Sequence, residues 1–214
     1  ADPRLTAEVN RVFTFLTTRQ HEGHQFEHLL VAPFNLRERL AELIEAEIAN
    51  ARAGKPAYIL LKLNALQDEA MIRLLYLAAD EGVRVQLNIR GISCLVPGGA
   101  GGPKRIVARG IVDRYLEHAR VYLFGNGGGP ENELVFVGSA DWMHRNLSRR
   151  VEVAFPIFDP TLRAELRALV DLQQHDNVKA RDYHNHLLVG EKKAEHVQAQ
   201  AVTYEYLRAA AKTP

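Results

Sequence analysis

The chain has 214 residues, of which 47% are hydrophobic and 25% are charged, and its formal net charge at pH 7 is +1. This composition is typical of a soluble globular protein with one substantial core. A net charge this small gives no general attraction to nucleic acid or to an anionic membrane, so an anion-binding site would have to be local.

The single cysteine, Cys94, excludes an internal disulfide and favours a reducing compartment, so we expect a cytoplasmic protein. There is no run of about 18 apolar residues, and we therefore expect no membrane span. The chain begins Ala1-Asp2-Pro3, without an initiator methionine or a signal peptide, which favours a fragment of a longer polypeptide.

The first half of the chain alternates between helical and strand patterns. Apolar residues between Leu5 and Leu16 follow a helical spacing, and a short strand over 28–34 is halted by Pro33. A long helix follows, with Asn35 as its N-cap and Gly54 at its end. Its apolar stripe consists of Leu36, Leu40, Leu43, Ile44 and Ile48.

The next three elements are a strand over 57–63, a helix over 66–80 closed by Gly82, and a strand over 83–91. This alternation predicts right-handed crossovers and a largely parallel sheet. The glycine-rich loop 97–105 lacks the strand and helix context of a dinucleotide-binding fingerprint. It is either a flexible connection or a phosphate contact made by its amides and by Lys104 or Arg105.

The second half has a different character. Strands over 120–124 and 133–139 flank a glycine-rich turn and predict a hairpin, and a further strand is expected over 149–158. Helices are expected at about 160–174 and 195–212. The last helix is expected to pack through the apolar residues Val197, Ala201, Tyr204 and Leu207.

Charged residues at the mouths of the apolar strands carry the chemical signal. A period of two places His118, Arg120, Tyr122 and Phe124 on one face of a strand. Arg90 ends another strand, at the edge where open α/β sheets bind ligands. Arginine's planar fork suits phosphate oxygens, and histidine is a general acid, base or nucleophile. Phosphate handling is therefore the favoured chemistry.

Further candidates lie between these strands and after them. Ser139 can donate to a phosphate oxygen, Asp141 can orient a histidine, and Glu152 is a third charged group on the apolar strands. Lys62 and Asn64 end a strand near Arg90, and ligand contact and simple solvation are about equally favoured for them. Metal binding by His21, His24 and His28, and nuclease chemistry by the HNH string at 184–186, have little support.

The spacing His118-x-Arg120, then Gly138-Ser139-x-Asp141, then Glu152, resembles the second half of the phospholipase D superfamily signature, His-x-Lys-x4-Asp followed by Gly-Ser-x-Asn. Arg120 replaces the lysine, Gly125 stands at the aspartate position, and Asp141 replaces the asparagine. The longer strings "IVDRYLEHARVYLF", "GSADWMHRNLSRRVEVAFPI" and "DNVKAR" resemble the C-terminal catalytic region of bacterial polyphosphate kinase, and this likeness covers nearly the whole chain.

The resemblance implies an α/β fold with a phospholipase D-like mixed β-sheet flanked by helices. It implies that residues 1–214 form one catalytic domain of a larger enzyme, with 1–27 as a helical lead-in from the preceding domain and 182–214 as a helical tail. In that family the γ-phosphate of ATP passes reversibly to inorganic polyphosphate through a phosphohistidine. No position of this chain matches that histidine, so we expect the chain alone to be inactive.

The resemblance also assigns roles. Arg90 matches an ATP-contacting arginine and His118 a second essential histidine, which is the expected catalytic residue of this chain. Arg120, Ser139, Asp141 and Glu152 are expected to hold phosphate or to line the site.

No metal site is expected here, because the Mg²⁺ of the whole enzyme would be bound upstream. ATP or ADP, polyphosphate, the N-terminal domains and a second copy of the enzyme are the expected partners, without nucleic acid; membrane association of the whole enzyme remains an alternative. A phosphodiesterase or nuclease, and a non-enzymatic nucleotide- or polyanion-binding module, are the alternative functions.

Overall fold

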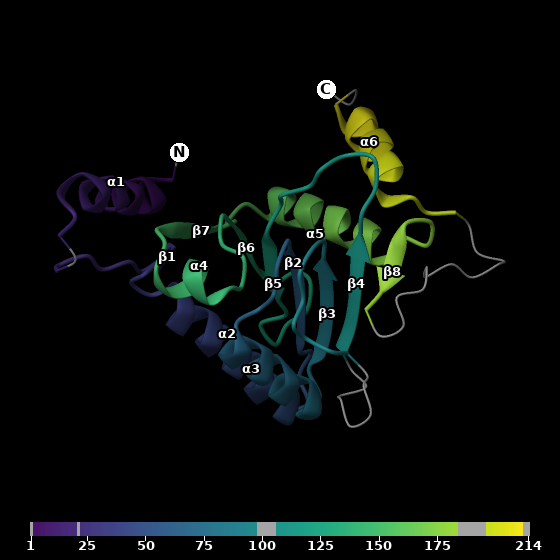
Figure 1. Ribbon diagram of the computed structural model, residues 1–214, viewed down its shortest axis with the longest axis horizontal. Helices are drawn as coiled ribbons and strands as arrows, with labels where there is room; N and C mark the ends of the chain where they lie inside the picture. The colour runs from purple at the N-terminus through teal and green to yellow at the C-terminus, as the bar shows by residue number, and fades with distance from the viewer. Residues whose placement is uncertain (1, 21, 98–105, 184–195, 212–214) are drawn as a thin grey trace.

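The computed structural model describes residues 2–20, 22–97, 106–183 and 196–211. Its centre is an eight-stranded sheet in the order β1-β7-β6-β5-β2-β3-β4-β8 (Figure 1). The strands are β1 (Leu30–Ala32), β2 (Tyr58–Leu63), β3 (Arg84–Ile89), β4 (Ile106–Ile111), β5 (Val121–Phe124), β6 (Leu134–Gly138), β7 (Glu152–Pro156) and β8 (Ala180–Asp182).

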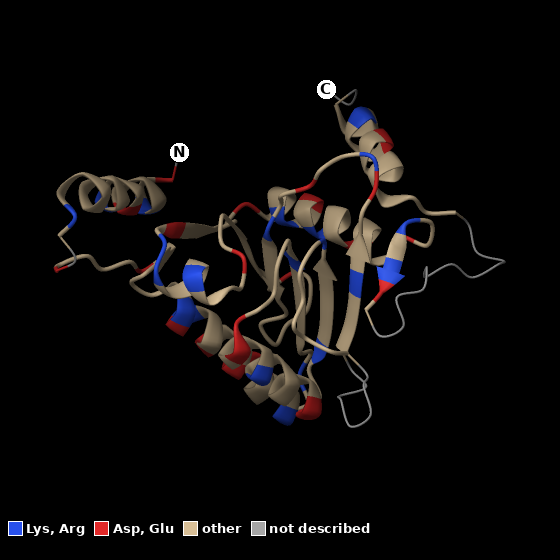
Figure 2. Cartoon of the chain, viewed as in Figure 1, with Lys and Arg blue, Asp and Glu red and all other residues tan. Residues whose placement is uncertain are grey.

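Helices cover both faces of this sheet (Figure 1). They are α1 (Pro3–Thr18), α2 (Leu36–Arg52), α3 (Glu69–Asp80), α4 (His144–Ser148), α5 (Pro160–Gln174) and α6 (Ala199–Ala210). Alternate residues of β2 divide the core: Ile59, Leu61 and Leu63 pack with α2 and α3, whereas Tyr58 and Leu60 pack with Val170 of α5. Basic and acidic residues are interspersed along α2 and α3 (Figure 2), so these helices present no surface of one sign.

The sheet is mixed, which confirms the fold class. The prediction of a largely parallel sheet is wrong, because only β2, β3 and β4 pair in parallel and every other pairing is antiparallel. The predicted hairpin is confirmed as β5 and β6, with Val121 opposite Val137. Among the described residues, no helix has the length and apolar character needed to cross a membrane.

Three short elements, β4, α4 and β8, were not predicted from the sequence. β4 follows the glycine-rich loop and contains Arg109 and Gly110, which dilute its apolar pattern. β8 has no apolar pattern and forms by pairing with β4, supported by Asp176, whose carboxylate accepts from three successive backbone N–H groups at 2.6–3.0 Å. Tertiary hydrogen bonds, rather than side-chain periodicity, determine this strand.

The inward face predicted for the last helix is also wrong. In α6 the residue that packs inward is Ala199, whereas Tyr204 and Leu207 are exposed. Asn35 is the N-cap residue of α2, which confirms the prediction, although its side chain makes no capping hydrogen bond to the helix. It accepts instead from the Val31 N–H and donates to the carbonyls of Phe26 and Leu29. Local backbone groups therefore outcompete the helix terminus for this side chain.

In α1 the buried face contains Glu8 beside Val12 and Phe15, whereas Val9, Phe13 and Leu16 of the apolar pattern are exposed. The Glu8 carboxylate explains this face. It accepts from the backbone N–H groups of Glu27, His28 and Leu29 at 2.7–3.2 Å, and so joins α1 to the segment that enters β1.

Replacing Glu8 by alanine should therefore destabilise the protein, because three backbone donors lose a charged acceptor. We expect the free energy of unfolding to fall by about 2 kcal/mol, the range of hydrogen bonds to charged groups. Urea denaturation followed by circular dichroism measures this change. Glu45→Ala, on the exposed side of α2, is the control and should change little; equal losses in the two variants would contradict the assignment.

Candidate functional site

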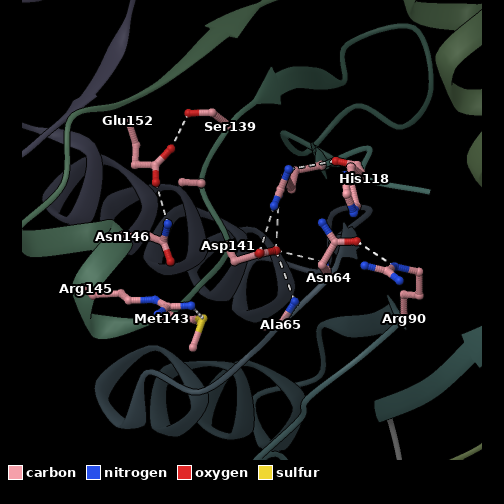
Figure 3. A network of polar contacts seen from close by, with 12 residues as sticks. Asn64, Ala65, Arg90, His118, Ser139, Asp141, Met143, Arg145, Asn146 and Glu152 are labelled. Carbon is pink, nitrogen blue, oxygen red and sulfur yellow. Dashed lines mark hydrogen bonds and ion pairs between the residues drawn. The ribbon is translucent and has the colours of Figure 1, made fainter. Parts of the chain in front are cut away.

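The candidate residues gather at one edge of the sheet because of the strand directions. β2 and β3 are parallel, so Asn64 and Arg90 follow their carboxyl ends at the same edge. β5 runs antiparallel to β2, which brings Arg120, at its amino end, to that edge as well. The loop after β6 then returns Asp141 to the same place, next to Asn64 and Arg120 (Figure 3).

Asp141 is the centre of this group. One of its oxygens accepts from the backbone N–H groups of Asn64 and Ala65, at 2.8 and 3.1 Å. Arg120 approaches the same carboxylate with Nε at 3.3 Å and Nη2 at 3.0 Å. Burial lowers the pKa of Arg120, but the Asp141 carboxylate more than offsets this and leaves the pKa raised. This ion pair, with the two backbone hydrogen bonds, holds three chain segments together.

Arg90 is attached to the same centre through Asn64. Its Nε donates to Asn64 Oδ1 at 3.0 Å, and its backbone N–H donates to the Leu63 carbonyl at 3.1 Å. The side chain of Arg90 is half-buried. Because only Nε is engaged in this contact, the terminal nitrogens of the guanidinium are left for a ligand at the sheet edge.

His118 lies outside β5, so the strand alternation does not orient its side chain as predicted. Its backbone carbonyl accepts from Arg120 Nη1 at 2.9 Å, whereas the residue itself is exposed. Among the described residues no histidine ring contacts Asp141, whose carboxylate binds Arg120 and two backbone amides. His118 lines a cavity of about 370 Å³ that lies between residues 115–119, α5 and α6.

Glu117, which precedes His118, is held by three elements that the sequence analysis did not connect. Its carboxylate lies 2.9 Å from Lys62 Nζ and accepts from Gln173 of α5 and Gln200 of α6 at 3.0 and 2.9 Å. Lys62 is 1% exposed, which rules out simple solvation at the strand end. Burial lowers the pKa of Lys62, opposed by the attraction of Glu117. This buried pair fixes the backbone just before His118.

Ser139 and Glu152 form a neighbouring pair. The Ser139 hydroxyl donates to one Glu152 oxygen, and Asn146 of α4 donates to the other (Figure 3). Val153 N–H donates to Ser139 Oγ at 3.2 Å, which ties the pair to β7. Asn146 was missed because α4 was missed. No contact that we observe among the described residues joins this pair directly to Arg90 or His118.

The remaining candidate residues add no further binding group to this site. Among the described residues, no group of three or more His, Cys, Asp or Glu side chains could hold a metal ion. His24 packs against Phe15 and Phe34 in aromatic contacts. Arg145 lies beside Met143 Sδ, at 3.7 Å, away from Arg90 in Figure 3. His21, residues 98–105 of the glycine-rich loop and the HNH string lie outside the described residues.

The arrangement favours binding of an anionic oxygen. Asp141 neutralises Arg120, and Glu117 neutralises Lys62, so these pairs build the frame. At the same edge, Arg90 keeps N–H groups that can donate hydrogen bonds. The exposed His118 is a residue type that can give or take a proton. These are the groups that phosphoryl transfer uses for positioning and electrostatic stabilisation.

Comparison with known proteins identifies the family. The sequence profile described as Polyphosphate kinase C-terminal domain 2 matches residues 29–201. The chain belongs to this family. The chain is similar to polyphosphate kinase of Salmonella typhimurium, with 44% identity over 97% of this chain and 30% of that protein. It is also similar to polyphosphate kinase 1 of Chlorobaculum tepidum, with 47% identity over 84% of this chain and 25% of that protein.

The solved structures agree. The crystal structure of polyphosphate kinase from Porphyromonas gingivalis matches with a TM-score of 0.93 and 41% identity, over 100% of this chain and 33% of that one. A phospholipase D family member, Nuc from Salmonella typhimurium, matches with a TM-score of 0.51 and 16% identity, over 73% of this chain and 97% of that one. The second likeness concerns the fold alone. This member of the polyphosphate kinase family spans about a third of its relatives' length.

Glu117→Gln should reveal the buried ion pair. The variant leaves the Lys62 ammonium without its counter-charge, and we expect a loss of about 3 kcal/mol in the free energy of unfolding at pH 7. The pKa of Lys62 falls further in the variant. Between this lowered pKa and that of the unfolded chain, the unfolded state binds more protons, so raising the pH should reduce the loss. Urea denaturation at pH 7 and 9.5 measures both effects.

The double variant Glu117→Gln/Lys62→Met should recover most of this stability, because no unpaired charge remains. Glu131→Gln, in the exposed turn before β6, is the matched control for a single carboxylate lost. If the double variant were as unstable as the sum of the two single variants, Lys62 and Glu117 would not be coupled.

Proposed function

We propose that this chain is the C-terminal part of a polyphosphate kinase, which transfers the γ-phosphate of ATP reversibly to inorganic polyphosphate. The family assignment supports the activity, and the placement of Arg90 and His118 at the same edge of the sheet is the structural observation that carries it. The proposal concerns the whole enzyme, of which this chain supplies the ATP- and phosphate-binding half of the site.

The proposed reaction has two transfers. In the first, the γ-phosphorus of ATP forms a bond to a histidine nitrogen of another domain, the bond to the β,γ-bridging oxygen breaks, and ADP leaves. In the second, a terminal oxygen of polyphosphate attacks that phosphorus and the nitrogen–phosphorus bond breaks. Each transfer moves negative charge between oxygens, so catalysis depends on donors that are already in position.

The residues of this chain have distinct roles in the proposal. Arg90 binds phosphate oxygens with its terminal nitrogens. His118 is the catalytic residue of this half, as an acid/base or as a donor that positions phosphate. Arg120 adds its two remaining N–H groups, while Asp141 holds it in place. Ser139 and Glu152 line the adjoining part of the site.

The proposal extends to the rest of the enzyme. Residues 1–27 lead in from a preceding domain, residues 182–214 form the tail, and the enzyme is a cytoplasmic homo-oligomer. The described residues do not fit a magnesium site, since Asp141 and Glu152 are engaged by Arg120 and by Ser139 and Asn146. Magnesium is therefore assigned to the missing domains, where it would neutralise phosphate charge.

We expect the isolated chain to make no polyphosphate, because it lacks the phosphorylated histidine. Incubation of the purified chain with ATP and Mg²⁺, followed by gel analysis of polymer, tests this expectation. The native polypeptide that contains the chain is the positive control. Polymer formed by the chain alone would refute the proposed division of the site.

Binding by the isolated chain should depend on Arg90 and His118. In calorimetric titrations with ATP and with polyphosphate, Arg90→Ala should weaken binding about tenfold or more, since a charged hydrogen bond to phosphate is lost. His118→Ala should have a smaller effect. Arg39→Ala, an exposed arginine of α2 paired with Glu42, is the control. Hydrolysis of a generic phosphodiester that His118→Ala abolishes would favour a phosphodiesterase instead.

A further inference from the structure

Asn64 has one polar group that the contacts around it do not use. The residue is 8% exposed and follows β2 directly. Its backbone N–H donates to Asp141, its backbone carbonyl accepts from Gly91 N–H at 2.9 Å, and its side-chain oxygen accepts from Arg90 Nε. Its side-chain nitrogen, Nδ2, is buried without a hydrogen-bond partner among the described residues.

The direction of this amide follows from chemistry. Arg90 can only donate, so the atom of Asn64 that faces it must be the oxygen. The opposite orientation would point an NH₂ group at an N–H group. Nδ2 is therefore directed away from Arg90, and Figure 3 shows it on the side of the Asn64 amide opposite Arg90.

A buried donor without a partner is costly, and native proteins contain few of them. The groups around Asn64 indicate which partner would suit it. Arg90 and Arg120 contribute positive charge, and the nearby carboxylate of Asp141 is already neutralised by Arg120. An anionic oxygen from outside the chain matches both this charge and the free N–H of Asn64.

A ligand must reach Nδ2 past the side chains at this edge, one of which is His118. That residue is exposed, and in the described part of the chain its ring makes no hydrogen bond. Rotation of an exposed side chain between staggered rotamers is inexpensive. A phosphate group that displaces the His118 ring slightly would therefore reach Nδ2 and the terminal nitrogens of Arg90 together.

We propose that Asn64 is a further ligand-binding residue, whose carboxamide holds Arg90 with its oxygen and donates from Nδ2 to an oxygen of the same bound phosphate group. This inference rests on the proposed function, because it requires phosphate at Arg90 and His118. It differs from a purely positioning role, in which Asn64 would affect the ligand only through Arg90.

A double-mutant cycle separates the two roles. Inorganic triphosphate is titrated calorimetrically into the wild-type chain, Asn64→Ala, Arg90→Ala, the double variant and His118→Ala. We expect Asn64→Ala to weaken binding roughly threefold to tenfold, the range of one hydrogen bond. The same substitution should still weaken binding about threefold in the Arg90→Ala background. Asn35→Ala is the matched control, since the side chain of this half-buried asparagine bonds to backbone groups beside β1, at the far end of the sheet, and should leave triphosphate binding unchanged.

Each other result has a definite meaning. If Asn64→Ala weakens binding in the wild type but not in the Arg90→Ala background, Asn64 only positions Arg90 and the proposed direct donation is wrong. If Arg90→Ala and His118→Ala weaken binding and Asn64→Ala does not, this inference fails while the proposed function stands. If the wild-type chain does not bind triphosphate, or if no variant alters binding, the proposed phosphate site itself is wrong. Thermal unfolding of every variant confirms that the comparisons are made on folded protein.

Discussion

The Asp141 carboxylate is the interaction on which the site depends. It accepts from two backbone amides at the end of β2 and from the side chain of Arg120 at the start of β5. The loop that carries it is fixed to the same region, because Trp142 exchanges backbone hydrogen bonds with Ala65 and with Gln67. One buried anion thus sets the relative positions of three segments that are distant in the sequence, and the position of Asn64 and Arg90 follows.

A second consequence concerns charge. The site region contains Lys62, Arg90 and Arg120, and burial of three unpaired cations would be prohibitive. Glu117 and Asp141 pair with Lys62 and Arg120 and make the frame neutral. The charge that remains is concentrated on Arg90, whose only side-chain contact in the frame is a neutral amide oxygen. A protein with a net charge of +1 can therefore present a local anion site without a generally basic surface.

Periodicity was sufficient for the elements that bury a regular apolar pattern. The stripe of α2 from Leu36 to Ile48 and the hairpin of β5 and β6 were predictable for this reason. Apolar periodicity was not sufficient where hydrogen bonds determine the structure. β8 depends on the hydrogen bonds of Asp176, and the buried face of α1 includes Glu8. The candidate residues were recognisable from their types and strand-end positions. Their partners were not, because the contacts of Lys62 with Glu117 and of Glu152 with Asn146 depend on how distant loops meet.

Two of the replacements in the phospholipase D-like signature, Arg120 and Asp141, are explained by their contact with each other. Arg120 stands where the signature has lysine and Asp141 where it has asparagine, and in this structure the two bind each other through a bidentate contact. A lysine beside an asparagine would keep its charge available for a phosphodiester. An arginine beside an aspartate has its charge neutralised and several of its N–H donors occupied by that aspartate. The paired change gives this edge of the sheet a rigid ion pair. His118, Arg90, the two remaining N–H groups of Arg120 and Nδ2 of Asn64 are then the groups at this edge that the proposed function assigns to phosphate.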